Sequence, residues 1–363
     1  MAQDVAPLER LEDRTTVVDP QAIEEEFARV WRDASVADSD ESSIRVRVLN
    51  LVAIASSDDD RDRFEDVMQV LPQRHPCRAL LAVAAPAYDR LGATISAHCW
   101  PAGGARRHIC SEEVLLTGAP HQQRELASAV LGLLAPELPT AVWLMGEPAL
   151  RGDLAPRVLD AADTILLDSS RFAGLREAYQ GALALREEHD ARCADLAWGR
   201  LSVWRALLAQ LFDGEDGARE LDQIRTIEIR GGAGVQFSEA LLLGAWLAAR
   251  LGLAIADSKV DGERLDASFY DGSREVRLVI APDAGGLALV ETRIATLDAE
   301  FVIELHGDSG HMHVRESWDS GSMRRIVEQS PADDASVLAL LLDGAMATDV
   351  YEEALRMALA LLG

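Results

Sequence analysis

Two patterns of apolar residues, which change near the middle of the chain, constrain the fold more than any other feature. In the first half, short and nearly continuous apolar runs alternate with segments of helical periodicity. The runs are residues 46–55, 77–85, 140–145 and 164–168. Such runs are typical of parallel strands that helices bury on both faces. The first half therefore predicts an α/β sandwich with a mixed sheet, whose antiparallel part is a hairpin at 91–100 and 107–116.

In the second half, strand-like runs follow one another on short turns. A strand at 224–230 and a strongly apolar helix at 238–251 precede seven strand-like runs between residues 254 and 328. Consecutive strands joined by short turns indicate an antiparallel meander. Helices at about 333–343 and 348–362 close the chain. The second half therefore predicts an α+β domain with a meander sheet that helices cover on one face.

The length of the chain supports two domains, because 363 residues exceed the size at which one core usually keeps growing. Residues 1–16 are polar and unpatterned, and we expect a flexible tail there. A helix begins after Asp19, a good N-cap, with Pro20 at its first position. We place the N-terminal α/β domain at 17–192 and the C-terminal α+β domain at 193–363.

A helix predicted at 196–212 joins the two halves and carries two tryptophans. Its apolar residues recur at steps of three and four and form one stripe: Trp198, Leu201, Trp204, Leu208 and Leu211. Arg200 and Arg205 fall off this stripe, so we expect them to be exposed. The regular stripe favours a buried, structural helix, but tryptophan and arginine also dominate many protein interfaces.

The charge balance argues against two classes of partner. The chain carries 61 acidic residues against 35 lysines and arginines, for a formal net charge of −26. Binding to nucleic acid or to an anionic membrane needs clustered basic residues. The beginning of the sequence has no basic segment followed by an apolar one, and the apolar run 241–256 is shorter than the roughly 20 residues of a membrane span. We therefore expect a cytoplasmic protein.

Three histidine–cysteine pairs suggest zinc, but their spacing does not support it. They are His75 with Cys77, His98 with Cys99, and His108 with Cys110. No Cys-x-x-Cys occurs, and neighbouring residues on a strand point to opposite faces. The chain has four cysteines, too few for a disulfide framework at this length. We expect no metal site, with the cysteines as small buried residues.

Three other segments are candidate sites. Gly231–Phe237 lies between a strand and a helix, but Phe237 stands where a dinucleotide fingerprint needs its last glycine. Asp168–Arg171 follows a predicted parallel strand; its serines suit helix capping, while Arg171 is a candidate for contacting an anion. His311 and His313 share a strand face, which permits a metal pair or a solvated hairpin tip. None forms a catalytic set, and we expect no cofactor.

A series of stretches occurs in a specific order along the chain: Ile44–Val52, Arg74–Ala79, Ala97–Trp100, Ile109–Val114, Leu138–Trp143, Gly146–Pro148, Asp163–Phe172 and Asp195–Asp213. Together these stretches resemble the OpcA family, the glucose-6-phosphate dehydrogenase assembly proteins of bacteria. The resemblance covers about residues 40–213, with a weaker match at 240–252. Each stretch is weak alone, but their order and spacing are specific.

The resemblance implies a non-enzymatic partner of glucose-6-phosphate dehydrogenase that promotes its active oligomer or activates it allosterically, in the oxidative pentose phosphate pathway. An activator need only bind one state of its target more tightly, and about 1.4 kcal/mol of difference shifts the population tenfold. The candidate contact residues are tryptophans and arginines: Trp198, Trp204, Arg200, Arg205, Arg74, Arg78 and Arg171.

Two alternatives remain open at this point. One is a sugar-phosphate-binding module or enzyme, with its site at the strand ends within 139–172 and the arginines of 74–78. The other is redox control through Cys77, Cys99 or Cys110, since Arg78 and Arg107 supply the positive charge that lowers a thiol pKa.

Overall fold

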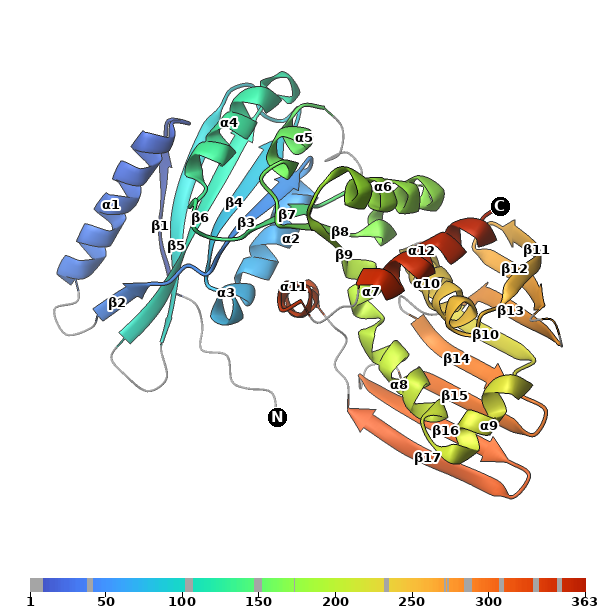
Figure 1. Ribbon diagram of the computed structural model, residues 1–363. Coiled ribbons are helices and arrows are strands. Elements are labelled where there is room, and N and C mark those ends of the chain that lie inside the picture. The colour runs from blue at the N-terminus through green and yellow to red at the C-terminus, as the bar shows by residue number, and fades with distance from the viewer. Residues whose placement is uncertain are drawn as a thin grey trace. The chain divides into compact units, whose positions relative to one another are not determined.

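Residue contacts divide the chain of the computed structural model into two compact units (Figure 1). Unit 1 comprises Met1–Asp168, Arg186–Ala194 and Asp334–Asp343, and unit 2 comprises Ser169–Leu185, Asp195–Asp333 and Gly344–Gly363. The structure describes residues 9–37, 42–101, 107–146, 152–172, 174–231, 235–270, 272, 274–283, 289–306, 310–328, 333–344 and 348–363. The predicted combination of an α/β and an α+β architecture is confirmed.

Unit 1 is built on a mixed sheet, which has nine strands among the described residues. The strands are β1 (Glu9–Thr16), β2 (Ser42–Arg45), β3 (Leu49–Ala55), β4 (Cys77–Ala84), β5 (Gly92–Pro101), β6 (Arg107–Gly118), β7 (Thr140–Leu144), β8 (Thr164–Leu167) and β9 (Arg192–Asp195). Their order is β1-β5-β6-β4-β3-β7-β8-β9, and β2 pairs with β6. The run from β6 to β8 is parallel, and the β5–β6 hairpin is antiparallel, as predicted.

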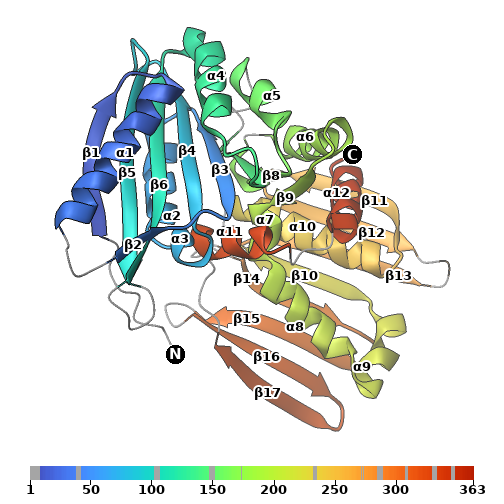
Figure 2. The ribbon, with the colours of Figure 1, turned by 60° about the vertical axis from the view of Figure 1, so that its left-hand side comes forward.

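Helices lie on both faces of this sheet, which explains the continuous apolar runs of its central strands. On one face lie α1 (Pro20–Ala37), α4 (Gln123–Leu133) and α5 (Leu154–Leu159). On the other lie α2 (Asp58–Met68), α3 (Leu71–Arg74) and α11 (Asp334–Leu342) (Figures 1 and 2). All seven residues of β3 are buried. The 3-10 turn η1 (Pro120–Gln122) leads into α4.

Three strands of unit 1 were not predicted: β1, β2 and β9, the last of which follows β8 in the strand order. Residues 9–16, assigned to a flexible tail, form β1, which pairs antiparallel with β5. Residues 42–45, for which no strand was predicted, form β2, which pairs parallel with β6. These two segments gain backbone hydrogen bonds from strands far away in the sequence, and such pairing leaves no apolar pattern in a local window.

Unit 2 has a second sheet, with eight strands among the described residues. The strands are β10 (Thr226–Gly231), β11 (Ala254–Asp261), β12 (Arg264–Tyr270), β13 (Glu275–Pro282), β14 (Leu289–Ala295), β15 (Ala299–His306), β16 (His311–Trp318) and β17 (Gly321–Glu328). Their order is β11-β12-β13-β10-β14-β15-β16-β17. The predicted meander thus runs on each side of β10, which is parallel to β13 and antiparallel to β14.

Helices cover one face of the unit 2 sheet. They include α7 (Leu196–Arg200), α8 (Ser202–Phe212), α9 (Glu215–Glu220), α10 (Val235–Arg250) and α12 (Thr348–Leu361), while α6 (Leu175–Glu188), η3 (Ser169–Arg171) and η4 (Leu221–Gln223) complete the unit. The covered face is apolar: Phe269, Leu278 and Phe301 are at most 1% exposed. Among the described residues no helix lies on the opposite face, which we call the open face (Figure 1).

The predicted bridging helix consists of α7 and α8, which meet at Leu201. Asp195 caps α7 by accepting a hydrogen bond from the Ala197 N–H at 2.9 Å. Trp198, Leu201, Trp204, Leu208 and Leu211 are all buried, so the predicted apolar stripe is confirmed. The helix pair belongs to the core of unit 2, where the Trp198 ring packs 5.6 Å from that of Tyr351.

One cysteine prediction was wrong. Cys99 and Cys110 are direct partners across the β5–β6 hairpin and form a disulfide. Strand pairing, rather than sequence spacing, brings them together. Cys77 and Cys193 are not in a disulfide and are buried, as expected. Within the described residues, no helix combines the length and the apolar character needed to span a bilayer.

Candidate functional site

The turn between β3 and α2 in unit 1 lies where a dinucleotide-binding fold places its phosphate loop. Glycines in that loop let a pyrophosphate approach the helix N-terminus. Here the turn reads Ser56-Ser57-Asp58-Asp59-Asp60, with no glycine. The Ser57 hydroxyl accepts a hydrogen bond from the Asp60 N–H, and the Asp60 carboxylate accepts one from the Ser56 N–H, each at 3.2 Å.

The chain's own groups therefore occupy the N-terminus of α2. Three carboxylates in the first helical turn interact favourably with the positive end of the helix dipole. The same carboxylates repel a phosphate. This turn is consequently unsuited to NAD or NADP, although the surrounding sheet has the parallel arrangement that often binds them.

A largely buried arginine occupies the region beside the ends of β7 and β8. Arg63 of α2 donates from Nη2 to the Asp168 carboxylate at 2.6 Å and also pairs with Asp334 of α11. Its guanidinium carbon lies 5.1 Å from the centre of the Trp143 ring. The strand-end site proposed within 139–172 thus contains the Arg63–Asp168 ion pair. The Asp168 carboxylate in this pair is inaccessible to solvent. Residues 147–151 of this stretch lie outside the described residues.

A cavity of about 190 Å³ in unit 1 lies at the opposite, amino-terminal ends of the strands. Leu49, Thr140 and Thr164, the first residues of β3, β7 and β8, line it together with His75 and Arg192. The Arg192 guanidinium donates to the Leu341 carbonyl at 3.0 Å, and His75 Nε2 lies 3.2 Å from the Asp343 carboxylate. These contacts attach α11 to unit 1, so the polar groups around this cavity have structural partners.

Arg74 and Arg78, two of the predicted contact residues, differ in their exposure and in their partners. Arg74 remains more than half exposed and pairs with Asp343. Arg78 is 3% exposed: it donates to the Glu112 carboxylate from Nε at 3.0 Å and from Nη2 at 2.7 Å, and it also pairs with Glu24. Burial raises the pKa of Glu112, but Arg78 and Arg47 lower it further, so the net pKa is below its ordinary value. Arg78 is a structural residue.

The two arginines on the bridging helix are not the exposed cations that the stripe predicts. Arg200 donates from Nη1 to the Glu239 carboxylate at 3.3 Å and to the Ser170 hydroxyl at 3.4 Å. Arg205 donates to the Trp198 carbonyl at 2.6 Å, with its guanidinium carbon 3.5 Å from the Trp198 ring centre. Burial lowers the pKa of Arg205 to about 9, so it keeps its charge at neutral pH. Trp198 and Trp204 are buried beside them.

The remaining candidates differ in accessibility. Arg171 is exposed in η3. Burial raises the pKa of the Cys77 thiol to about 12, which makes it unreactive. Within the described part of the chain, no group of three or more His, Cys, Asp or Glu side chains is arranged to hold a metal ion. The glycine segment after Gly231 lies mostly outside the described residues.

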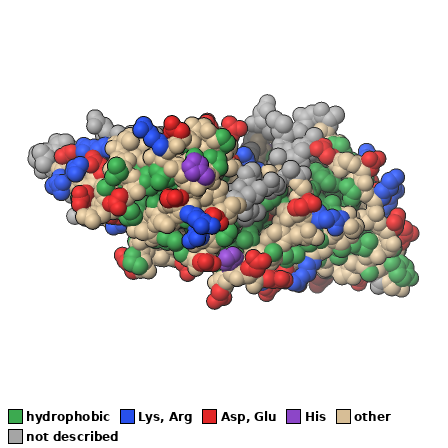
Figure 3. Space-filling view, turned by 90° about the horizontal axis from the view of Figure 1, so that it is seen from above, with side chains coloured by type: hydrophobic (Ala, Val, Ile, Leu, Met, Phe, Trp, Pro, Cys, Tyr) green, Lys and Arg blue, Asp and Glu red, His purple; other side chains and the backbone are tan. Residues whose placement is uncertain are grey.

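The sequence interpretation overlooked the open face of unit 2. Arginines and glutamates of neighbouring strands pair across it: Arg230 with Glu291 at 2.8 Å, and Arg293 with Glu300 at 2.7 Å. The available signal was the alternation of charged with apolar residues in β14–β16, which indicates one solvated face. Acidic and basic side chains are also interspersed over the face of the molecule that Figure 3 shows.

Comparison with known proteins connects both halves of the chain to one family. Residues 69–185 match the domain described as glucose-6-phosphate dehydrogenase subunit N-terminal domain, of the OpcA type, and residues 191–355 match the corresponding C-terminal domain. The chain is 30% identical over 203 residues to an OxPP cycle protein OpcA of Synechococcus elongatus, a match that covers 54% of this chain and 44% of that protein. An OpcA protein of Synechocystis is 30% identical over 189 residues, covering 51% and 39%.

Among solved structures, the chain is similar to KijD10, a 3-ketoreductase from Actinomadura kijaniata in complex with NADP. The TM-score is 0.50 at 12% identity, covering 86% of this chain and 96% of that one. At this identity the likeness concerns the fold alone. The alignments with the curated relatives span less than half of the length of each. The two domain matches together cover more than half of this chain, and the chain therefore belongs to the OpcA family of glucose-6-phosphate dehydrogenase subunit proteins.

Proposed function

We propose that this chain is a non-enzymatic assembly factor and allosteric activator of glucose-6-phosphate dehydrogenase in the oxidative pentose phosphate pathway. The observation that carries the proposal is the match of both halves to domains described as subunits of that dehydrogenase. The names of the cyanobacterial relatives, OxPP cycle proteins, support the same pathway. The proposal includes a cytoplasmic location.

The chemistry of the α2 turn supports a role without catalysis. A dehydrogenase of this fold needs a helix N-terminus that accepts pyrophosphate, and here Asp58, Asp59 and Asp60 occupy it. The alternative of a sugar-phosphate site at the strand ends within 139–172 has less support, because Arg63 already neutralises Asp168 there.

An activator acts by binding the active assembly of its target more tightly than the inactive one. A difference of about 1.4 kcal/mol in binding free energy changes the population ratio tenfold, so a modest contact surface is sufficient. Of the arginines predicted as contacts, Arg74 and Arg171 are the exposed ones. We propose them as contact candidates, whereas Trp198, Trp204, Arg78, Arg200 and Arg205 have structural partners inside their units.

The test combines enzyme kinetics with measurements of size. We expect the purified chain to raise kcat or lower the KM for glucose 6-phosphate of its cognate dehydrogenase, and to shift that enzyme to a larger species in light scattering. The chain alone should neither bind NADP nor oxidise glucose 6-phosphate. Unchanged kinetics and unchanged size at saturating chain would reject the proposal, and NADP binding by the chain would reject its non-enzymatic part.

Charge reversal tests the contact candidates. Arg171→Glu should reduce activation, because it replaces an exposed cation by an anion. Arg157→Glu, at an exposed position of α5, makes the same change of charge outside the candidates and serves as the control. If both variants activate the dehydrogenase equally, Arg171 is not part of the contact surface.

A further inference from the structure

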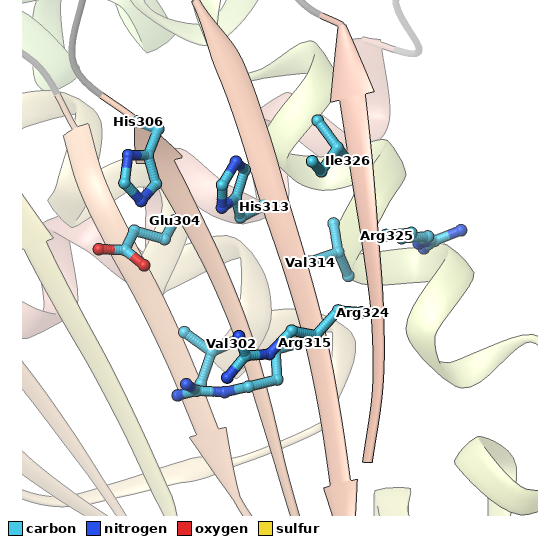
Figure 4. A pocket seen from close by; sticks show the side chains of 9 residues that line it. All are labelled: Val302, Glu304, His306, His313, Val314, Arg315, Arg324, Arg325 and Ile326. Carbon is cyan, nitrogen blue, oxygen red and sulfur yellow. The ribbon is translucent and has the colours of Figure 1, made fainter.

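A cavity of about 390 Å³ opens on the open face of unit 2, where β15, β16 and β17 run side by side (Figure 4). Pockets that bind small molecules have volumes of roughly 300–1,000 Å³. Most of the lining comes from alternate residues of three paired strands, so these side chains are positioned by the sheet itself. Its lining includes Val302, Glu304, His306, His313, Arg315 and Arg324.

Two arginines form one side of this cavity. Arg315 and Arg324 are direct partners across the β16–β17 pair, and Figure 4 shows both side chains extending in the same direction, beside Val302. Like charges directly opposite each other destabilise a strand pair. Arg315 Nη2 lies 3.6 Å from the Glu300 carboxylate, which also accepts a hydrogen bond from Arg293 at 2.7 Å. Arg324 has no ion pair among the described residues.

The other side of the cavity carries groups that suit hydroxyls. Glu304 and His313 are direct partners across β15 and β16. The His306 and His313 rings stack with their centres 4.2 Å apart. A carboxylate accepts hydrogen bonds from hydroxyl groups, and an imidazole can accept or donate them. Ile326, which is 65% exposed, adds an apolar edge that a ligand can cover.

The geometry points to a binding site for a sugar phosphate in this cavity, with the phosphate on Arg315 and Arg324 and the sugar hydroxyls on Glu304 and His313. Arginine forks match phosphate oxygens in pairs, and an anion between the two guanidinium groups relieves their mutual repulsion. The Glu304 carboxylate disfavours a bare anion but favours a ligand that donates hydroxyl hydrogen bonds. The inference concerns the chain alone and does not depend on its binding to the dehydrogenase.

Calorimetry on the full chain, without any dehydrogenase, tests the site with three probes. We expect saturable binding of glucose 6-phosphate at one site per chain, weaker binding of inorganic phosphate, and none of glucose. Arg324→Glu should weaken glucose 6-phosphate binding at least about tenfold, because it removes a charge-assisted hydrogen bond. Arg264→Glu reverses an exposed arginine on β12 that does not line the cavity, and should leave binding unchanged.

Replacement of Glu304 separates a sugar phosphate from a bare anion. Glu304→Gln should weaken the binding of glucose 6-phosphate while strengthening that of inorganic phosphate, because the substitution removes both a hydroxyl acceptor and a negative charge. Absence of saturable glucose 6-phosphate binding would overturn the inference. So would equal losses in Arg324→Glu and Arg264→Glu, or a gain for both probes in Glu304→Gln. Thermal melts check that the variants fold, and Arg324→Gln replaces Arg324→Glu if the latter does not.

Discussion

The sheets of the two units differ in how their faces are covered, and the difference decides where charged groups lie. In unit 1, helices cover both faces and β3 is buried at every position. In unit 2, β13 alternates between buried and more exposed residues, because helices cover only one face. A sheet with helices on both faces leaves little room for a site except at the ends of its strands. A sheet with helices on only one face presents its other face to solvent.

The burial of charged groups differs between the two units in the same way. In unit 1 the Arg78–Glu112 pair is buried and the Arg63–Asp168 pair is nearly so, and both carboxylates are inaccessible to solvent. On the open face of unit 2, the paired Arg293 and Glu300 are each about one-third exposed, and the Arg315–Arg324 pair is only partly neutralised. Buried pairs of this kind hold a fold together, whereas a partly solvated arrangement is free to bind a ligand.

The largest expected effect is a difference in stability between substitutions on the two faces of β13. Leu278 is inaccessible and lies under α10, where a Cβ on Gly244 would come within 3.0 Å of it. Leu278→Ala should lower the free energy of unfolding by about 2–5 kcal/mol through lost burial and a cavity. Its neighbour Val279 points to the open face, and Val279→Ala should cost less than about 1 kcal/mol. Urea unfolding measures both; equal losses would show that the open face is covered.

Removal of a buried charge tests the paired interior of unit 1. Glu112→Ala leaves Arg78 buried with Glu24 as its remaining carboxylate partner, and we expect a loss of about 3 kcal/mol. Arg124→Ala breaks the exposed Arg124–Asp153 pair and should have no measurable effect on stability. A small loss in Glu112→Ala would mean that water reaches Arg78.

Two helical glycines test how closely the helices of unit 2 pack. A Cβ on Gly217 of α9 would lie 2.1 Å from the Leu211 carbonyl oxygen, so Gly217→Ala should destabilise by about 1–3 kcal/mol. A Cβ on Gly181 of α6 meets no described atom within 4 Å. Gly181→Ala should therefore stabilise the protein by about 0.5–1 kcal/mol, through helix propensity. If Gly217→Ala and Gly181→Ala shift the melting temperature in the same direction, the difference in packing between these two positions is contradicted.

The smallest expected effect is a difference between the two sheets in how strongly acid weakens the stabilisation from an ion pair. Glu112 lies in the interior of unit 1, and Glu291 lies on the open face of unit 2. In the folded state, burial raises the pKa of each carboxyl, but neighbouring arginines lower it more. Both pKa values are therefore below their ordinary values. Their stabilisation is therefore complete above the unfolded pKa and is lost as pH falls through the folded pKa. The difference in unfolding free energy between wild type and Glu112→Gln should shrink from about pH 6 to pH 3. Glu291→Gln should show a smaller change, because solvent screens its pair with Arg230. Equal changes would show that the two pairs are equally desolvated.

Most helices and strands follow from local residue patterns. The alternation of apolar runs with helical periods located the central strands β3, β4, β7 and β8, and the turns located β11–β17. The apolar stripe correctly predicted a buried Trp198 and Trp204. For the candidate contacts, the sequence supplied residue types but could not show which were accessible, since Arg200 and Arg205 reach back into unit 2.

What the sequence determined by itself is the set of elements and their apolar faces, because hydrophobic periodicity records local geometry. What only the tertiary structure decided is the pairing of distant segments: β1 beside β5, β10 between β13 and β14, and the Cys99–Cys110 disulfide. The same holds for the cavity beside Arg315 and Arg324, which exists because three strands align in register. Register depends on hydrogen bonds between residues far apart in the chain, and these leave no trace in any short window of sequence.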